Sequence, residues 1–157
     1  MPIRSAGILL FRRKPDLELL LVHPGGPYWR GKDRHAWTIP KGIVGADEDH
    51  LTAAKREFQE ETGWEISGRP HALGTFKLYS GKLLEAWAVE GDGDPETMKS
   101  NSFSMIWPPN GGRLQSFPEI DRGSWFKPEE ARIHITKGQL PLVDALLHLL
   151  SAGRKTP

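Results

Sequence analysis

The segment from Gly42 to Trp64 constrains this chain more strongly than any other part of its sequence. It contains three glutamates, Glu57, Glu60 and Glu61, that are spaced three and four residues from the first. On a helix, such residues share one face, so three carboxylates gather there and repel one another. An acidic helix face is often only solvated surface, but clustered carboxylates are also ligands for Mg²⁺, with substrate phosphates completing its shell. The segment therefore indicates phosphate chemistry.

The spacing of the surrounding residues favours this chemical interpretation. Gly42 is followed by five residues and Glu48, then by seven residues and the run Arg56-Glu57-Phe58-Gln59-Glu60-Glu61-Thr62-Gly63-Trp64. At every fixed position, this pattern resembles the signature of the Nudix hydrolases. The resemblance implies an α/β chain with the Nudix fold, which is an α/β/α sandwich around a central mixed β-sheet.

Shorter segments outside the signature resemble subgroups of the same family. The run Trp37-Thr-Ile-Pro-Lys-Gly42 is similar to a motif of the asymmetric dinucleoside tetraphosphate hydrolases. Segments 23–27, 87–91, 100–101, 107–109 and 117–119 resemble a bacterial subgroup of predicted NTP pyrophosphohydrolases. These likenesses cover nearly the full length, and they define the fold more firmly than the substrate.

The resemblance also implies a metal centre. Its cofactor would be Mg²⁺, with Mn²⁺ as a substitute. The positions that match the metal ligands of the family are the carboxylates of Glu57, Glu60 and Glu61 and the backbone carbonyl of Lys41. Metal ions neutralise phosphate oxygens and lower the pKa of bound water, so hydrolysis by metal-activated water and an alkaline pH optimum are expected.

Further residues are expected to support this centre. By resemblance, Arg56 orients Glu57 without touching the metal, and Glu48 acts through Arg56 or through metal-bound water. Gly42 lets the backbone approach the metal. In this family a further catalytic carboxylate often lies in a loop before a late Trp-containing strand, and Glu119 has that spacing. Glu57 and Glu119 are therefore both candidates for the general base.

The contacts to the substrate are less sharply defined. Candidates for binding the polyphosphate are the cations Lys32, Arg34 and Lys41, because lysine binds phosphate as a point charge and arginine can bind it bidentately. Tyr28 is a candidate for stacking on a base, with Trp29 and Tyr79 as alternatives. Each of these residues has a plainer interpretation as a surface charge or a partly buried aromatic.

Composition narrows the class of protein and its partners. The 157 residues predict a single domain over 1–157. The 21 Lys and Arg nearly balance the 20 Asp and Glu, so no extended nucleic acid and no membrane is expected as a partner. The lack of cysteine fits a reducing cytoplasm, and no segment has the pattern of an export signal. A cytoplasmic monomer or homodimer is predicted.

Hydrophobic patterning predicts short strands between two main helices. Strands are expected at 5–11 and 17–23 as a hairpin, at 36–40 as a short piece, at 69–78 and 82–89 as a second pair, and at 102–107 and 123–126. Asp47 or Asp49 can cap a helix over 49–62 that Gly63 ends, with its glutamates facing outward. Further helices are expected at 127–131 and 138–150, the last capped by Thr136.

These observations predict a Mg²⁺-dependent hydrolase that cleaves a phosphoanhydride bond of a nucleoside polyphosphate. An NTP, a dNTP or a dinucleoside tetraphosphate is the expected substrate. The alternatives are a pyrophosphohydrolase for ADP-ribose or for RNA 5′ ends, and a Nudix domain that senses a nucleotide without catalysis.

Overall fold

The computed structural model describes residues 3–13 and 15–154. Along the chain its main elements are β1 (Arg4–Arg13), β2 (Leu17–Pro24), β3 (Lys41–Ile43), α1 (His50–Thr62), β4 (His71–Lys77), β5 (Leu83–Glu90), β6 (Ser102–Trp107), β7 (Arg113–Pro118), β8 (Ile120–Phe126), α2 (Pro128–His134) and α3 (Leu140–Arg154). Two short 3₁₀ turns, η1 (Pro95–Thr97) and η2 (Lys137–Gln139), lie before β6 and α3. None of the described helices is long and apolar enough to cross a membrane.

Six strands form one mixed sheet in the order β4-β5-β1-β2-β8, with β3 paired to β1. β1 is parallel to β5 and antiparallel to β2 and β3. The predicted hairpins β1–β2 and β4–β5 are both confirmed. The register sets Gly7 opposite Lys41 and Ala6 opposite Gly42, so β3 holds the start of the signature segment against the central strand.

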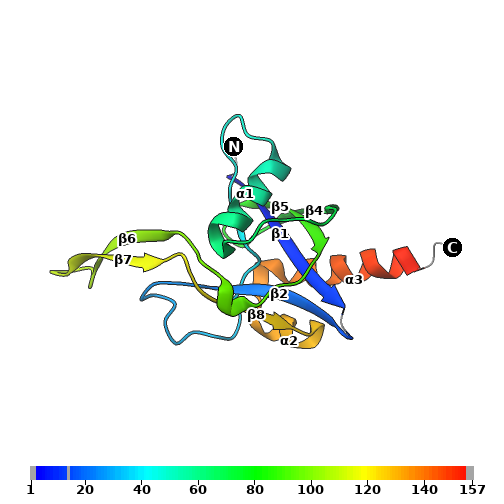
Figure 1. Ribbon diagram of the computed structural model, residues 1–157. Coiled ribbons are helices and arrows are strands. Elements are labelled where there is room, and N and C mark those ends of the chain that lie inside the picture. Colours follow the sequence, from blue (N-terminus) through cyan, green and yellow to red (C-terminus); the bar gives the residue numbers. More distant parts are fainter. Residues whose placement is uncertain (1–2, 14, 155–157) are drawn as a thin grey trace.

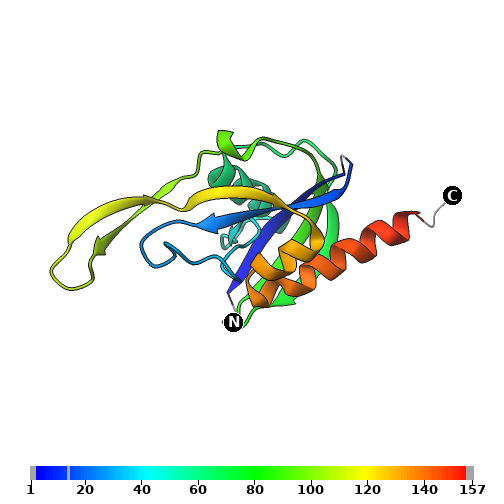
Figure 2. The same ribbon diagram turned by 90° about the horizontal axis from the view of Figure 1, so that it is seen from below.

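Helices cover both faces of this sheet (Figures 1 and 2). Because side chains of a strand alternate between faces, β1 serves two cores. Ile8 and Leu10 pack in the cluster that contains Phe58 of α1. Leu9 packs in the cluster that contains Leu142 of α3. The predicted α/β/α sandwich with a central mixed sheet is thereby confirmed.

Helix α1 begins and ends where the sequence predicts. The Asp49 side chain accepts a hydrogen bond from the Thr52 amide, and Gly63 ends the helix at φ 77°, a left-handed conformation that favours glycine. The expectation that Glu57, Glu60 and Glu61 all face outward is wrong for Glu61, which is only 9% exposed. The last turn of α1 lies over β3, where the Lys41 amide donates to the Glu61 carboxylate.

The strands after β5 differ from the prediction. Residues 113–118, expected as part of a loop, form β7 and pair with β6 in a separate two-stranded sheet. This β6–β7 hairpin projects away from the body of the molecule (Figures 1 and 2). β8 begins at Ile120 rather than at residue 123, so Glu119 lies at the junction of two strands. Thr136 precedes η2 without a side-chain capping bond, and α3 starts at Leu140.

Candidate active site

The candidate site begins where β3 meets α1. The Lys41 amide donates to Oε1 of Glu61 at 3.3 Å. A Cβ atom built on Gly42 would overlap the carboxylate of Glu57. Glycine is therefore needed at position 42 because the Glu57 carboxylate lies directly against its backbone. This close approach of a side chain is an observation that the signature pattern alone did not provide.

Arg56 holds the carboxylates together from the exposed side of α1. Its Nε and Nη2 donate to the two oxygens of Glu48 at 2.7 and 2.9 Å. Its Nη1 donates to Glu57 at 2.9 Å and to Glu60 at 3.1 Å. The hydrogen bonds from Arg56 hold the pKa of Glu48 at about 2. Arg56 thus contacts Glu57, as the family resemblance implies, and it ties Glu48 and Glu60 to the same centre.

Glu119 joins this cluster from the β7–β8 junction. Its amide donates to the Asn101 carbonyl at 2.8 Å, and the Asn101 amide donates to the Glu60 carbonyl at 2.8 Å. The Glu119 carbonyl accepts from the Gly25 amide at 2.8 Å. The root of the hairpin is therefore fixed to the end of α1, and Glu119 comes close to glutamates that precede it by about 60 residues in the sequence.

Burial and mutual repulsion raise the pKa values of these acids. The pKa of Glu61 is raised to about 8 by burial, the largest cause, and by the charges of Glu57 and Glu119, against the hydrogen bond from the Lys41 amide. Burial also raises the pKa of Glu57, against the hydrogen bond from Arg56. The pKa of Glu119 is raised by burial and then by the charges of Glu57 and Glu60. The carboxylates of Glu57, Glu60, Glu61 and Glu119 therefore interact electrostatically within one cluster.

The cluster has the donor chemistry for a hard divalent cation. Within the described part of the chain, no group of three His, Cys, Asp or Glu side chains is already arranged to hold a metal ion, and Arg56 occupies oxygens of Glu57 and Glu60. The fit rests instead on chemistry, since partly buried carboxylates that repel one another are neutralised by a cation that prefers oxygen ligands. Glu57, Glu60 and Glu61 are the acids of α1 that could hold such an ion.

A cavity of about 290 Å³ opens beside Lys41. It lies between the β2–β3 loop (residues 25–40), the β4–β5 turn and η2, and both Trp29 and Tyr79 line it. Burial lowers the pKa of the Lys41 ammonium, and the Glu61 carboxylate opposes this. Of the predicted substrate contacts, Lys41 lines this cavity and Tyr28 does not. The Tyr28 ring instead lies edge-on to the Trp107 ring, with 5.0 Å between the ring centroids.

Lys32 and Arg34, the other predicted phosphate contacts, are exposed on the β2–β3 loop and do not line the cavity. The structure therefore brings Lys41 to the carboxylate cluster but leaves these two cations on the outer surface of the loop.

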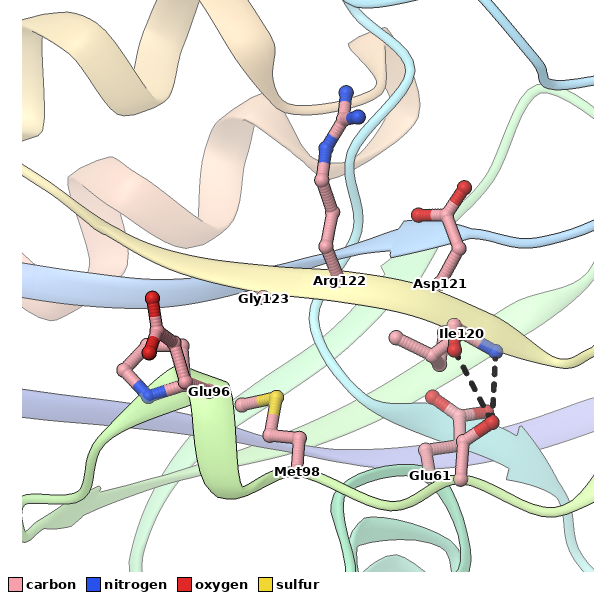
Figure 3. Close-up of a pocket in the computed structure, with 9 residues that line it drawn as sticks. Glu61, Glu96, Met98, Ile120, Asp121, Arg122 and Gly123 are labelled. Atoms are coloured by element: carbon pink, nitrogen blue, oxygen red, sulfur yellow. Dashed lines mark hydrogen bonds between the residues drawn. The ribbon is translucent and has the colours of Figure 1, made fainter.

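A second cavity, of about 240 Å³, opens on the Glu61 side of the cluster. Figure 3 shows Glu61, Met98 and Glu96 on one side of β8, while the side chains of Asp121 and Arg122 point to the other side. Glu61 lines this second cavity and Lys41 lines the first. The Lys41 amide donates to the Glu61 carboxylate, so the residues that link the two cavities are in direct contact.

The family model described as NUDIX domain matches residues 1–146. The chain belongs to the Nudix family. It is 40% identical over 105 residues to the RNA pyrophosphohydrolase of Caulobacter vibrioides, covering 61% of this chain and 52% of that protein. It is 40% identical over 74 residues to the asymmetrical bis(5′-nucleosyl)-tetraphosphatase of Rattus norvegicus, covering 43% of this chain and 46% of that enzyme. The chain spans about half the length of the curated relatives that it matches.

Solved structures confirm the Nudix fold over nearly the whole chain. A Caenorhabditis elegans Ap4A hydrolase in a binary complex superposes with a TM-score of 0.66 at 21% identity, covering 94% of this chain and 98% of the other. The Nudix domain of Shewanella oneidensis NrtR, in complex with ADP ribose, gives 0.65 at 14% identity, with 96% and 89% covered. At these identities, the likeness concerns the fold alone.

One residue of this Nudix chain holds the β2–β3 loop in place and has no counterpart among the predicted site residues. His23 is 1% exposed, its Nδ1 lies 2.9 Å from Asp121, and its Nε2 lies 2.6 Å from the Lys32 carbonyl. A β-bulge between His23 and Pro24 leaves Asp121 as the extra residue of β8, and bulges of this kind re-aim side chains. The sequence alone does not reveal this contact, because nothing local predicts a partner 98 residues away.

Proposed function

We propose that this Nudix chain hydrolyses a phosphoanhydride bond of a nucleoside polyphosphate with the help of a divalent cation, for which Mg²⁺ is the preferred ion. The observation that carries the proposal is the gathering of the partly buried carboxylates of Glu57, Glu61 and Glu119, whose pKa values are raised chiefly by burial and further by neighbouring acids. Such a cluster costs free energy unless it binds positive charge. A polyphosphate bound through a divalent cation provides both the charge and a substrate.

In this proposal, Glu57, Glu60 and Glu61 hold the cation together with the Lys41 carbonyl. When bound, a divalent cation neutralises phosphate oxygens and lowers the pKa of a bound water. Arg56 keeps Glu57 turned toward Gly42, and the bidentate bond to Glu48 keeps Arg56 in place. The hydrogen bonds support Glu48 as a partner of Arg56.

The general base is assigned to Glu119 in preference to Glu57. The Glu57 carboxylate accepts a hydrogen bond from Arg56. Among the described residues, no hydrogen bond or ion pair reaches the Glu119 carboxylate. Burial and the charges of Glu57 and Glu60 raise the pKa of Glu119, which makes its carboxylate more basic. A general base typically contributes about 10²–10⁴-fold to the rate.

The two cavities favour a substrate with a group on each side of its phosphates. Lys41 meets the phosphates, and Trp29 or Tyr79 stacks on a base in the cavity beside it. The cavity on the Glu61 side leaves room for a second nucleoside. A dinucleoside polyphosphate is therefore preferred over an NTP, consistent with likeness to a protein named asymmetrical bis(5′-nucleosyl)-tetraphosphatase.

The test is hydrolysis of a nucleotide panel with Mg²⁺, with products separated by chromatography. The panel contains diadenosine tetraphosphate, the NTPs and dNTPs, ADP-ribose and a 5′-triphosphorylated RNA. We expect Glu60→Gln to abolish turnover, while Glu65→Gln, a change at an exposed glutamate just beyond α1, leaves it intact. ATP plus AMP from the tetraphosphate would establish asymmetric cleavage. Tight nucleotide binding without any turnover would refute the enzyme and support a sensor.

A further inference from the structure

The outer side of the β2–β3 loop carries cations without acidic partners. Arg30, Lys32 and Arg34 are all exposed. Among the described residues, none of them forms an ion pair. The acid between them, Asp33, accepts a hydrogen bond from the Trp37 indole at 2.8 Å and lies 3.4 Å from His134. The loop therefore presents net positive charge to solvent although the whole chain is nearly neutral.

Two exposed aromatic side chains precede these cations in the loop. Tyr28 is 56% exposed and Trp29 is 40% exposed. Tyr28 lies edge-on to Trp107 of β6 with ring centroids 5.0 Å apart, and the Lys32 ammonium lies 5.4 Å from the Trp29 ring centroid. Neighbouring exposed aromatic rings that are flanked by charged side chains are typical of an interaction site.

The β6–β7 hairpin extends this surface away from the body. Arg113 of β7 is directly opposite Trp107 in the antiparallel register, so both side chains lie on the same face of the hairpin. The loop that follows β2 lies alongside the hairpin in both views (Figures 1 and 2). We call residues 28–34 together with Trp107 and Arg113 the aromatic–basic surface.

The aromatic–basic surface is held in a fixed position. Three hydrogen bonds hold it. The buried His23 ring bonds the Lys32 carbonyl, and the Trp37 indole donates to the Asp33 carboxylate. The Gly25 amide donates to the Glu119 carbonyl. The last of these bonds fastens the loop to the residue that we assign as general base. Trp29 also lines the cavity beside Lys41. The surface is therefore continuous with the carboxylate cluster and preorganised next to it.

We propose that the aromatic–basic surface binds a single-stranded RNA chain of a few nucleotides. Exposed aromatics give bases a sequence-tolerant stacking platform, and unpaired cations follow the phosphodiester backbone. This partner goes beyond the proposed hydrolysis of small nucleotides. Only the choice of RNA over DNA rests on the proposed function, because a phosphoanhydride at the 5′ end of a polynucleotide is a product of RNA synthesis.

The experiment measures fluorescence anisotropy of a labelled ten-nucleotide oligo-uridine with a 5′-hydroxyl end, in EDTA and over a range of salt concentrations. This probe has no anhydride, so binding is independent of hydrolysis. Lys32→Ala/Arg113→Ala removes two cations, and Tyr28→Ala removes one aromatic. The matched control is Lys55→Ala/Arg69→Ala, two exposed cations on α1 and in the connection that follows it.

We expect the double variant to bind the RNA about tenfold more weakly. The slope of log binding constant against log salt concentration should become less steep by about 1.4, which is roughly 0.7 for each lost phosphate contact. Tyr28→Ala should weaken binding without changing the salt dependence, and the control should bind like the unmodified protein. The proposal is overturned by absence of saturable binding at low salt, by an equal loss in the control, by equal affinity for duplex RNA, or by much tighter binding of oligo-thymidine. None of these outcomes depends on whether nucleotides are hydrolysed.

Discussion

At the scale of single residues, Gly42 and Arg56 hold the carboxylates from two directions. Gly42 lets the Glu57 carboxylate lie against the backbone of β3. Arg56 neutralises part of the charge from the solvent side by donating to Glu48, Glu57 and Glu60. The position of Glu57 is therefore determined by the lack of a side chain on one side and by a guanidinium on the other.

The change Gly42→Ala tests the first of these constraints. The new methyl group would displace the Glu57 carboxylate, and a displacement on the order of 1 Å in a catalytic centre can lower the rate by about 100-fold. We expect a loss of this size in kcat, measured with saturating Mg²⁺. Gly45→Ala is the matched control, because its Cβ would meet no atom closer than 3.4 Å. An equal loss in both variants would contradict this account.

Glu61 predicts a pH dependence of stability for the metal-free protein. Its pKa is raised from 4.5 to about 8 in the folded state, so the folded protein keeps a proton that the unfolded chain has released. The free energy of unfolding should therefore decrease as pH rises from 4.5 to 8, by at most about 1.4 kcal/mol per pH unit. Above that window the contribution is constant.

This prediction is checked by urea titration in EDTA at several pH values. The side chain of Glu61→Gln cannot ionise. The free energy of unfolding of this variant, relative to that of the unmodified protein, should therefore rise as pH increases across the same window. Glu65→Gln, at an exposed position, should keep the original pH dependence. Parallel pH curves for all three proteins would mean that Glu61 is ionised throughout.

At the scale of elements, the sequence predicts those with strong local signals and misses those that depend on distant partners. Helix α1 was predictable because Asp49 and Gly63 mark its ends and its apolar residues recur at helical spacing. Strand β7 was not predictable, since most of its side chains are exposed. It is formed by pairing with β6, which includes the contact of Phe103 with Phe117.

The same reasoning separates the predicted from the unpredicted parts of the site. The three glutamates of α1 are neighbours through helix geometry, so the sequence alone places them together. The bond between His23 and Asp121 depends on the pairing of β2 with β8 and on a bulge in that pairing. The pairing of Trp29 with Tyr79 in one cavity likewise requires a turn and a loop far apart in the chain.

The His23–Asp121 contact predicts a measurable cost at the element scale. Asp121→Ala leaves the buried His23 ring without one of its two partners, and an unsatisfied buried donor costs about 1–3 kcal/mol. Asp16→Ala is the comparison, because Asp16 forms an exposed ion pair with Lys127 at 3.7 Å, and exposed pairs contribute about 0–1 kcal/mol. We expect the larger loss in urea-derived unfolding free energy for Asp121→Ala. A reversed order would show that the β2–β8 contact does not stabilise the fold.

At the scale of the whole molecule, the carboxylate cluster joins segments that are distant in the sequence. Glu57 and Glu61 come from α1, the Lys41 amide comes from β3, and Glu119 comes from the β7–β8 junction. Their repulsion opposes the packing of these segments, whereas a bound cation would favour it. Cation binding should therefore stabilise the complete fold and not only the helix that carries the glutamates.

This coupling gives a prediction that needs no substrate. A cation that binds only the folded state raises the free energy of unfolding by about 2.7 kcal/mol at one hundred times its dissociation constant. We expect Mg²⁺ to raise the thermal midpoint of the unmodified protein, and the increase to shrink strongly in Glu60→Gln and moderately in Glu119→Gln. NaCl at matched ionic strength is the control, because screening alone would also relieve repulsion between exposed charges. If NaCl and Mg²⁺ stabilise the protein equally, the acids form no specific cation site, and the proposed hydrolysis loses its structural basis.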